Sequence, residues 1–250
     1  MAKYQGRGLH GQIVEQIGVR IVGGSYQPGA PLFADHLEQE FDVSKTVVRE
    51  ALKVLAAKGL VESRQKRGTV VRLRRAWNLL DEDVLRWQGG EAPDFNFLEN
   101  LAEVRSIVEP AGARLAAKRR TDADIESMTE ALAAMRTARD DPDAAVAADV
   151  RFHRAVLEAT HNELLSRMEV VLSAGLQVRD RFVHHSKPGS DAIPTHQALL
   201  DAITSGDAEL AGTTVEALLA QASADLTELR SQVKRNPRRA ITDRRSTERD

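Results

Sequence analysis

Three side chains in the second half of the chain have the types and spacing of ligands for one metal ion. Asp149 and His153 are four residues apart, so they lie on the same face of a helix, and aliphatic neighbours on that face direct both inward. His196 lies on the apolar side of a later helical segment. Because carboxylate and imidazole groups are ligands of divalent metals, the three residues predict a metal site. The alternative is that they are core residues whose polar atoms are satisfied by hydrogen bonds within the fold.

Arg105 is a fourth polar residue on a face that should be apolar. It follows Leu98 and Leu101 at helical spacing, which directs its guanidinium into a core. A buried guanidinium is costly unless it is paired. Two kinds of partner for this guanidinium remain open: a small acidic ligand, or a core carboxylate such as Glu109 or Asp149.

One candidate function is that of a metal-dependent enzyme, such as a hydrolase or lyase, that uses Asp149, His153 and His196. The sequence contains no nucleophile elbow, phosphate-binding loop or HExxH motif, and no second carboxylate is placed as a general base. These absences argue against catalysis.

A helix predicted from residue 45 to about residue 58 carries basic and hydroxyl side chains on one side. Ser44 stands at its N-cap position. The face predicted to be buried consists of Val48, Ala51, Leu52 and Leu55. The opposite face carries Lys45, Thr46, Arg49 and Lys53. Because arginine can bond two acceptors of a guanine edge while lysine and hydroxyl groups hold phosphates, this helix is suited to the DNA major groove.

Residues 60–73 predict two short strands joined by a polar turn at residues 65–68. The turn and its flank carry Arg64, Lys66, Arg67 and Gly68. A basic hairpin tip after a helix-turn-helix is typical of a wing that reaches the adjacent minor groove. An ordinary solvated basic surface is the alternative, and the combination of spacing, wing and local charge argues against it.

The basic helix and the hairpin need further elements to position them. Periodicity predicts helices over residues 9–23 and 34–41, separated by a Pro/Gly turn at residues 25–31. Residues 8–75 are therefore expected to form a winged helix-turn-helix of three helices and a β-hairpin wing. Residues 76–96 are expected to be a connector.

The remainder of the chain is expected to be helical. From residue 97 to residue 230 the pattern is helical, rich in alanine and poor in aromatic residues, which is typical of an all-α antiparallel helix bundle. Breaks are expected near residues 140–143, 185–194 and 205–206. Residues 231–250 are highly charged and are expected to form a disordered basic tail. The predicted fold class is therefore mainly α.

Composition and charge limit the classes of protein. The net charge of −2 divides into +6 over residues 1–75, −13 over residues 76–229 and +5 over residues 230–250. This distribution indicates that the basic head, residues 1–75, binds a polyanion, whereas the acidic body has a different role. The chain has no cysteine, which excludes disulfides and thiolate zinc sites. It has neither a signal peptide pattern nor an apolar run of the ~18 residues that a membrane span requires, so we expect a cytoplasmic protein.

The head resembles the DNA-binding domain of the GntR family of transcription regulators. The segments that carry the resemblance are QPGAPL and FDVSKTVVREALKVLAAKGLVESRQKRGTVV, within residues 8–73. The resemblance implies that Arg49 reads bases, that Lys45 replaces the usual arginine after the V-S pair, and that Arg67 and Gly68 form the wing tip. The resemblance therefore implies a DNA-binding regulator.

The head departs from the family pattern at two places. The segment of residues 32–37 is one residue shorter than usual. Asp35 and His36 stand where an arginine often contacts DNA. The contact of that arginine with DNA therefore stays open in this chain, because His36 is only a weak substitute for it.

Residues 97–230 resemble the FCD ligand-binding domain of the FadR-type branch of the GntR family. The matching segments are EVRSIVEPAGARLAA, DVRFHRAVLEATHNELL and THQALLDAITSGDAELA. Many such domains hold a divalent metal such as zinc through one aspartate and three histidines, and Asp149, His153 and His196 match three of the four positions. Leu218 stands at the fourth, so the ligand set is incomplete. His184 or His185 is a candidate replacement.

The connector RRAWNLLDEDVLRW, together with the incomplete metal motif, resembles the members of this branch that control the use of sugar acids. The resemblance implies an effector such as galactonate, with its carboxylate on Arg105 and its hydroxyl groups on Asp149, His153 and His196, with or without a metal. Because one helix-turn-helix reads only a few base pairs, we expect a homodimer on a pseudo-palindromic operator. A repressor released by the effector is the common case in the family, and the sequence does not distinguish it from an activator. Two roles remain open for the arginines of the tail. They add non-specific contacts to DNA phosphates, or they belong to a solvated, disordered tail.

Overall fold

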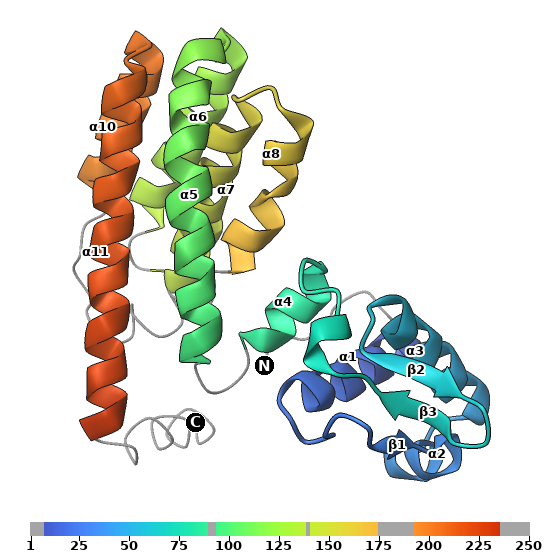
Figure 1. Ribbon diagram of the computed structural model, residues 1–250. Helices are drawn as coiled ribbons and strands as arrows, with labels where there is room; N and C mark the ends of the chain where they lie inside the picture. Colours follow the sequence, from blue (N-terminus) through green and yellow to red (C-terminus); the bar gives the residue numbers. More distant parts are fainter. Residues whose placement is uncertain (1–7, 90–93, 139–140, 175–192, 236–250) are drawn as a thin grey trace. The chain divides into compact units, whose positions relative to one another are not determined.

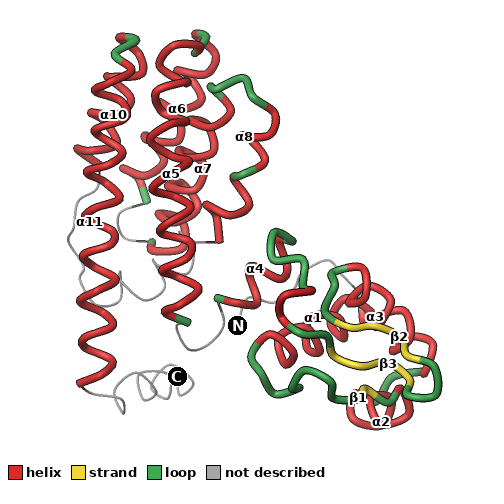
Figure 2. Tube along the Cα trace, viewed as in Figure 1, coloured by secondary structure: helices red, strands yellow, loops and turns green. Residues whose placement is uncertain are grey.

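The computed structural model describes residues 8–89, 94–138, 141–174 and 193–235. The chain divides into two compact units, the first ending at Ala92 and the second beginning at Pro93. Helices dominate both units, and strands occur in the first (Figure 2). The predicted fold class is therefore confirmed.

Three helices form the first part of the first unit: α1 (Leu9–Val22), α2 (Ala34–Phe41) and α3 (Lys45–Ala57). Isoleucines spaced four residues apart make the buried stripe of α1. α2 ends at Phe41, and its C-cap residue Asp42, with a φ of +50°, turns the chain toward the start of α3. All three helices lie where their periodicity predicted them, because each buries one aliphatic face in a common core.

A three-stranded antiparallel sheet in the order β1-β3-β2 completes this core. β2 (Val61–Arg64) and β3 (Gly68–Val71) form the predicted hairpin. The third strand, β1 (Pro31–Leu32), lies partly within the segment that was expected to be only a turn. A two-residue strand is too short to show an alternating pattern, and an edge position tolerates a proline because it needs no donor there.

A short helix, α4 (Glu82–Gln88), packs onto α1 and so belongs to the first unit, whereas residues 76–96 were expected to be only a connector. Trp87 is 3% exposed and its ring lies against Gly18 of α1, where a Cβ atom would come within 2.5 Å of the ring. Glycine is therefore required at this close approach between the two helices.

Ion pairs surround the contact of α4 with the rest of the first unit. Lys58 Nζ lies 2.8 Å from carboxylate oxygens of both Asp81 and Asp83. Arg86 pairs with Asp83 at 2.7 Å and with Glu15 of α1 at 2.8 Å. Burial alone would raise the pKa of Asp83, but Lys58 and Arg86 outweigh it and lower that pKa to about 2.

The second unit is a helix bundle, shown in Figure 1. Its labelled helices are α5 (Phe95–Arg119), α6 (Asp122–Thr137), α7 (Pro142–Glu158), α8 (Glu163–Arg167), α10 (Ile193–Ser205) and α11 (Ala208–Arg235). The two longest, α5 and α11, lie side by side and antiparallel, since Glu99 pairs with Arg230 and Arg114 with Glu216. α11 continues to Arg235, so the first residues of the tail expected from residue 231 are helical. The rest of that tail lies outside the described residues.

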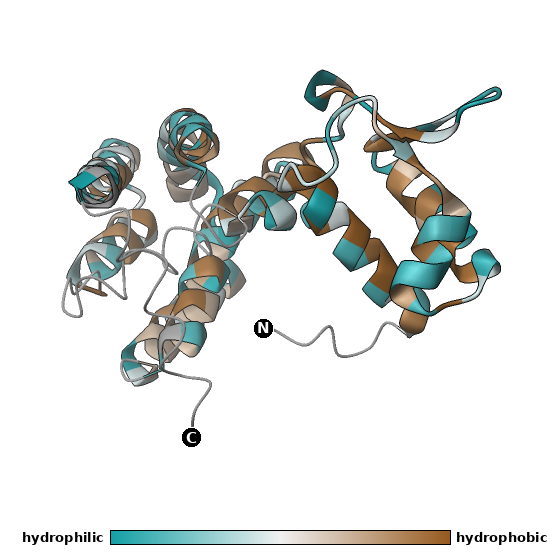
Figure 3. Ribbon diagram, turned by 90° about the horizontal axis from the view of Figure 1, so that it is seen from below, coloured by the Kyte–Doolittle hydropathy of each residue, from teal (hydrophilic) through white to brown (hydrophobic). Residues whose placement is uncertain are grey.

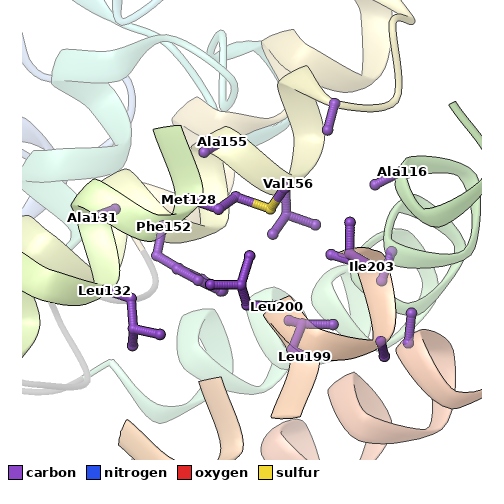
Figure 4. Close-up of a cluster of buried hydrophobic side chains, with 14 of the residues drawn as sticks. Ala116, Met128, Ala131, Leu132, Phe152, Ala155, Val156, Leu199, Leu200 and Ile203 are labelled. Atoms are coloured by element: carbon purple, nitrogen blue, oxygen red, sulfur yellow. The ribbon is translucent and has the colours of Figure 1, made fainter. Parts of the chain in front are cut away.

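The core of the bundle lies among α5, α6, α7, α10 and α11 (Figure 4). Phe152, Met128 and Leu199 are among its large, fully buried members, and alanines fill much of the remainder. Small side chains let the helices approach closely, which explains the high alanine content. None of the helices in the described part of the chain combines the length and apolar character of a membrane span.

Candidate functional site

The N-terminal end of α3 is exposed and carries side chains that were predicted to contact DNA. Ser44 caps the helix, because its Oγ accepts a hydrogen bond from the backbone N–H of Val47 at 3.4 Å. The aliphatic face of the helix is buried as predicted, by Val48, Ala51, Leu52 and Leu55. This burial leaves Thr46 and Arg49 exposed on the outward side.

Two of the basic residues on α3 are paired with carboxylates. Lys45 Nζ forms an ion pair with Asp35 in the first turn of α2. Lys53 pairs with Glu50, one turn before it on α3, at 2.7 Å. Arg49 forms no salt bridge with any described residue. Of these three basic residues, Arg49 is therefore the one that no carboxylate in the described part of the chain engages in a salt bridge.

The tip of the β2–β3 hairpin is exposed and basic. Its turn requires left-handed backbone at Lys66, with φ +62°, and at Gly68, with φ +72°. Arg64 pairs with Glu62 on the same strand at 2.6 Å, while Lys66 and Arg67 extend the positive charge to the tip. Figure 3 shows this tip as hydrophilic.

A second group of polar residues lies inside the helix bundle and is called the buried cluster below. α5 supplies Arg105 and Glu109, α7 supplies Asp149 and His153, and α10 supplies His196. Asp149 Oδ1 lies 2.9 Å from His196 Nε2 and 3.6 Å from His153 Nε2. Glu109 Oε2 lies 3.0 Å from the other ring nitrogen of His153, Nδ1. The predicted residues from three helices therefore meet at one place.

Arg105 has Glu109 as its carboxylate partner in this cluster. Arg105 Nε donates a hydrogen bond to Glu109 Oε1, one helical turn further along α5. Of the two core carboxylates considered from the sequence, the structure thus selects Glu109. The role of Arg105 toward a ligand stays a prediction.

The charges of the buried cluster stabilise one another. Burial alone would raise the pKa of Glu109, but His153 and Arg105 outweigh it and lower that pKa to about 2. Burial opposes the ionisation of Asp149 as well, yet His153 and His196 hold the pKa of that carboxyl well below its usual range. Burial would lower the pKa of His153, but Glu109 and Asp149 raise it. The cluster therefore holds ionised carboxylates in the interior of the bundle.

Asp149, His153 and His196 fit a divalent metal ion. One potential ligand atom from each residue lies within 4.8 Å of the others. Because Glu109 engages His153 through Nδ1, the Nε2 atom of that ring faces Asp149 as a ligand atom would. Leu218, at the position of the family's fourth ligand, is packed against the hydrophobic core. His184 and His185 lie outside the described residues.

A cavity of about 550 Å³ lies between α5 and α11, next to the buried cluster. Its walls include the aliphatic side chains of Leu98, Leu101, Leu219 and Leu226. Arg105 belongs both to the wall of this cavity and to the cluster. The volume lies within the range of sites for small molecules.

Sequence reasoning missed two contacts of the site. Glu109 was considered only as a partner of Arg105, although it also lies against His153. Asp35 was noted only as a departure from the family pattern, although it pairs with Lys45. The signal in each case was an acidic residue near basic residues in the sequence pattern. That pattern does not identify the contact, because the contact depends on how two helices pack against each other.

Comparison with known proteins identifies both halves of the chain. Residues 9–71 match the model described as bacterial regulatory proteins, gntR family, and residues 100–221 match the model of the FCD domain. The galactonate operon transcriptional repressor of Escherichia coli (strain K12) is 35% identical over 224 residues, covering 87% of this chain and 96% of that protein. The chain belongs to the GntR family. Its second half is an FCD domain of the FadR type.

Two further proteins match across both domains. The transcriptional regulator YieP of Escherichia coli (strain K12) is 30% identical over 213 residues, covering 83% of this chain and 90% of that protein. The solved structure of Lar, which controls the expression of the Listeria monocytogenes agr system, matches with a TM-score of 0.68 at 18% identity, covering 89% of this chain and 98% of that chain. This last likeness shows the fold alone.

As a GntR-family protein with an FCD domain, the chain is a DNA-binding transcription regulator and not an enzyme. The hydrolase or lyase considered from the three metal-ligand residues is therefore excluded. The two domains imply DNA and a small molecule as partners.

Proposed function

We propose that this GntR-family regulator is a repressor that a small carboxylic acid, such as the sugar acid galactonate, releases from DNA. The buried cluster is the observation that carries the proposal. Charged groups inside a helix bundle are costly, and apolar residues of similar volume would stabilise the fold at least as well. A ligand-binding role explains why Arg105, Glu109, Asp149 and the two histidines are there. The likeness to a galactonate operon repressor supports the choice of galactonate as the ligand.

The cluster and its cavity match the groups of a sugar acid. The carboxylate pairs with Arg105, in competition with Glu109, through charge-assisted hydrogen bonds. The hydroxyl groups bond to Asp149, His153 and His196, which offer both donors and acceptors. The adjoining cavity of about 550 Å³ provides room for the rest of the ligand.

A divalent metal such as zinc would be held by Asp149, His153 and His196. When bound, it supplies an electrophilic centre with open coordination positions that oxygen atoms of the effector can fill. Glu109 orients His153 for this role through Nδ1. Because Leu218 contributes no ligand atom, we expect weaker metal binding than in a domain with four protein ligands.

On the DNA side, the head contacts an operator with α3 in the major groove and the hairpin tip at the minor groove. The proposed contact residues are Ser44, Lys45, Thr46, Arg49, Arg64, Lys66, Arg67 and Gly68. Effector binding lowers DNA affinity if the effector favours a state of the protein in which the heads fit the operator less well.

The active species is proposed to be a homodimer joined through α5. An outward stripe on this helix, formed by Val104, Ile107, Val108, Ala111 and Leu115, is exposed or half-buried, and Ile107 is 68% exposed. An antiparallel copy of α5 would place Glu103, near its start, opposite Lys118, near its end. The stripe is thus self-complementary in charge, as a two-fold contact requires.

Calorimetric titration of chelator-treated protein with galactonate and related aldonic acids, with and without added zinc, tests the ligand. Binding without metal would support a site made of protein side chains alone. Binding only with zinc would support a site in which the acid completes the coordination of the metal. Absence of binding in both conditions would refute the sugar-acid assignment, and a screen of other organic acids would then follow.

A further inference from the structure

A carboxylate stands within the DNA-binding face of the head, where the surrounding charge is positive. Asp35 lies in the first turn of α2 with 68% of its side chain exposed, and it forms an ion pair with Lys45. Its charge also interacts with Arg49, one turn further along α3. A carboxylate at this position repels the phosphates of any duplex, so it reduces affinity unless it meets a donor on the DNA.

Lys45 is held at the N-terminal end of α3, the helix proposed to enter the major groove. It is the first residue of α3, and its backbone N–H donates a hydrogen bond to Glu38 Oε1 at 3.2 Å. Its side chain extends to Asp35, so the ammonium and the carboxylate occupy the same end of the recognition helix. The N-terminal residues of such a helix are those that contact base edges.

The chemistry of the pair matches a base pair and not a phosphate. In the major groove, guanine presents two acceptors, O6 and N7, while cytosine presents an amino donor at N4. A lysine ammonium donates to the first group and a carboxylate accepts from the second. We propose that Asp35 and Lys45 form one base-reading pair that selects a G·C base pair in each half of the operator.

The pair also removes one cation from non-specific binding. With Asp35 ionised beside it, Lys45 neutralises less phosphate charge than an unpaired lysine does, so non-specific duplexes gain little from it. Discrimination therefore comes from both an attractive contact with the correct base pair and a repulsive contact with other DNA. The inference rests only on DNA binding by the head and is independent of the effector.

A matched pair of variants separates this role from a simple change of charge. Asp35→Asn removes the carboxylate that faces α3. Glu40→Gln removes an equivalent charge from the same helix, at a residue that pairs with Arg20 of α1. Asp35→Glu keeps a carboxylate at the site. Thermal unfolding of each full-length variant checks that the head is folded.

Each protein is used to select binding sequences from a pool of random duplexes, and its affinity for a non-specific duplex is measured over a range of salt concentrations. For Asp35→Asn we expect the preference for G·C at one position per half-site to fall roughly tenfold. Non-specific binding should tighten, and its salt slope should steepen by about one per head as Lys45 becomes available to phosphate. Glu40→Gln should change neither quantity, and Asp35→Glu should retain part of the preference.

Two results would overturn the proposal. Selection of the same bases with the same strength by Asp35→Asn would show that the carboxylate is an ordinary surface group. Tighter binding to all duplexes with an unchanged base preference would show that Asp35 only opposes non-specific DNA.

Discussion

In the buried cluster, carboxylates alternate with groups that are or can become cationic. Arg105 contacts Glu109, Glu109 contacts His153, and His153 faces Asp149. Because the carboxylates are already paired within the protein, an anionic effector must compete with Glu109 for Arg105 or bring the compensating charge of a metal. This competition links ligand binding to contacts between α5 and α7.

Arg105→Ala should reduce the affinity for galactonate at least about tenfold, because the ligand carboxylate loses a charge-assisted contact. The matched control is Arg114→Ala, which removes an arginine of the same helix that pairs with Glu216. Calorimetry measures both affinities, and circular dichroism checks folding. Equal galactonate affinity in the Arg105 variant and the wild type would disprove the assigned role.

Leu218→His should raise zinc affinity at least about tenfold, because it places an imidazole at the position of the missing ligand. Leu219→His, at the next position along α11, serves as the control. Competition with a chromogenic zinc chelator measures the change. An unchanged zinc affinity in the first variant would mean that residue 218 does not complete the site.

The sequence indicated which side chains of the cluster point inward, but not which of them touch. Helical spacing placed Arg105, Asp149, His153 and His196 on apolar faces, and all four lie in the cluster. Periodicity describes one helix at a time. The choice of Glu109 over Asp149 as the partner of Arg105 depends on the distance between α5 and α7, which no single-helix pattern contains.

At the scale of elements, α4 extends the DNA-binding unit beyond the winged helix-turn-helix. Trp87 packs on α1, and Lys58 reaches from the end of α3 to Asp81 and Asp83. The positions of α1 and α3 are thereby tied to α4. A seven-residue helix carries too little periodicity to predict such docking, whereas longer amphipathic helices such as α1 and α3 were predicted correctly.

Asp83→Asn should destabilise the first unit by on the order of 2 kcal/mol near neutral pH, because the pKa of Asp83 is lowered in the folded state. That carboxyl has a folded pKa of about 2 against an ordinary value of 3.8. Its stabilising contribution is therefore present above pH 3.8 and is lost as the pH falls toward 2. Urea unfolding at several pH values measures the difference between variant and wild type.

The control for this prediction is Glu82→Gln, which removes an exposed charge from the same turn of α4. It should unfold like the wild type at each pH. A free-energy difference between Asp83→Asn and the wild type that persists undiminished at pH 2 would contradict the ion-pair explanation.

At the scale of the whole molecule, the two functional parts of the chain differ in the sign of their net charge. Residues 1–75 carry a net charge of +6, while residues 76–229 carry −13. The first segment meets the DNA polyanion, and the FCD domain binds the small molecule. Charge asymmetry and family motifs made this division predictable, but neither specifies the operator or the effector.

Ile107→Glu should shift the protein from dimer to monomer, because it places a buried charge in the contact proposed between two copies of α5. Leu164→Glu makes the same kind of change at an 80% exposed residue of α8 and should leave the dimer intact. Sedimentation velocity measures the oligomeric state. If Ile107→Glu remains a dimer, the contact lies elsewhere.

The most direct test of the account is whether the proposed effector weakens DNA binding. Fluorescence anisotropy of a labelled duplex, chosen from the selection above, gives the Kd of the wild-type protein with galactonate and with neutral galactose as the control. The account predicts that saturating galactonate raises the Kd at least about tenfold and that galactose has no effect. Galactonate binding, established by calorimetry, together with an unchanged Kd for DNA would contradict it.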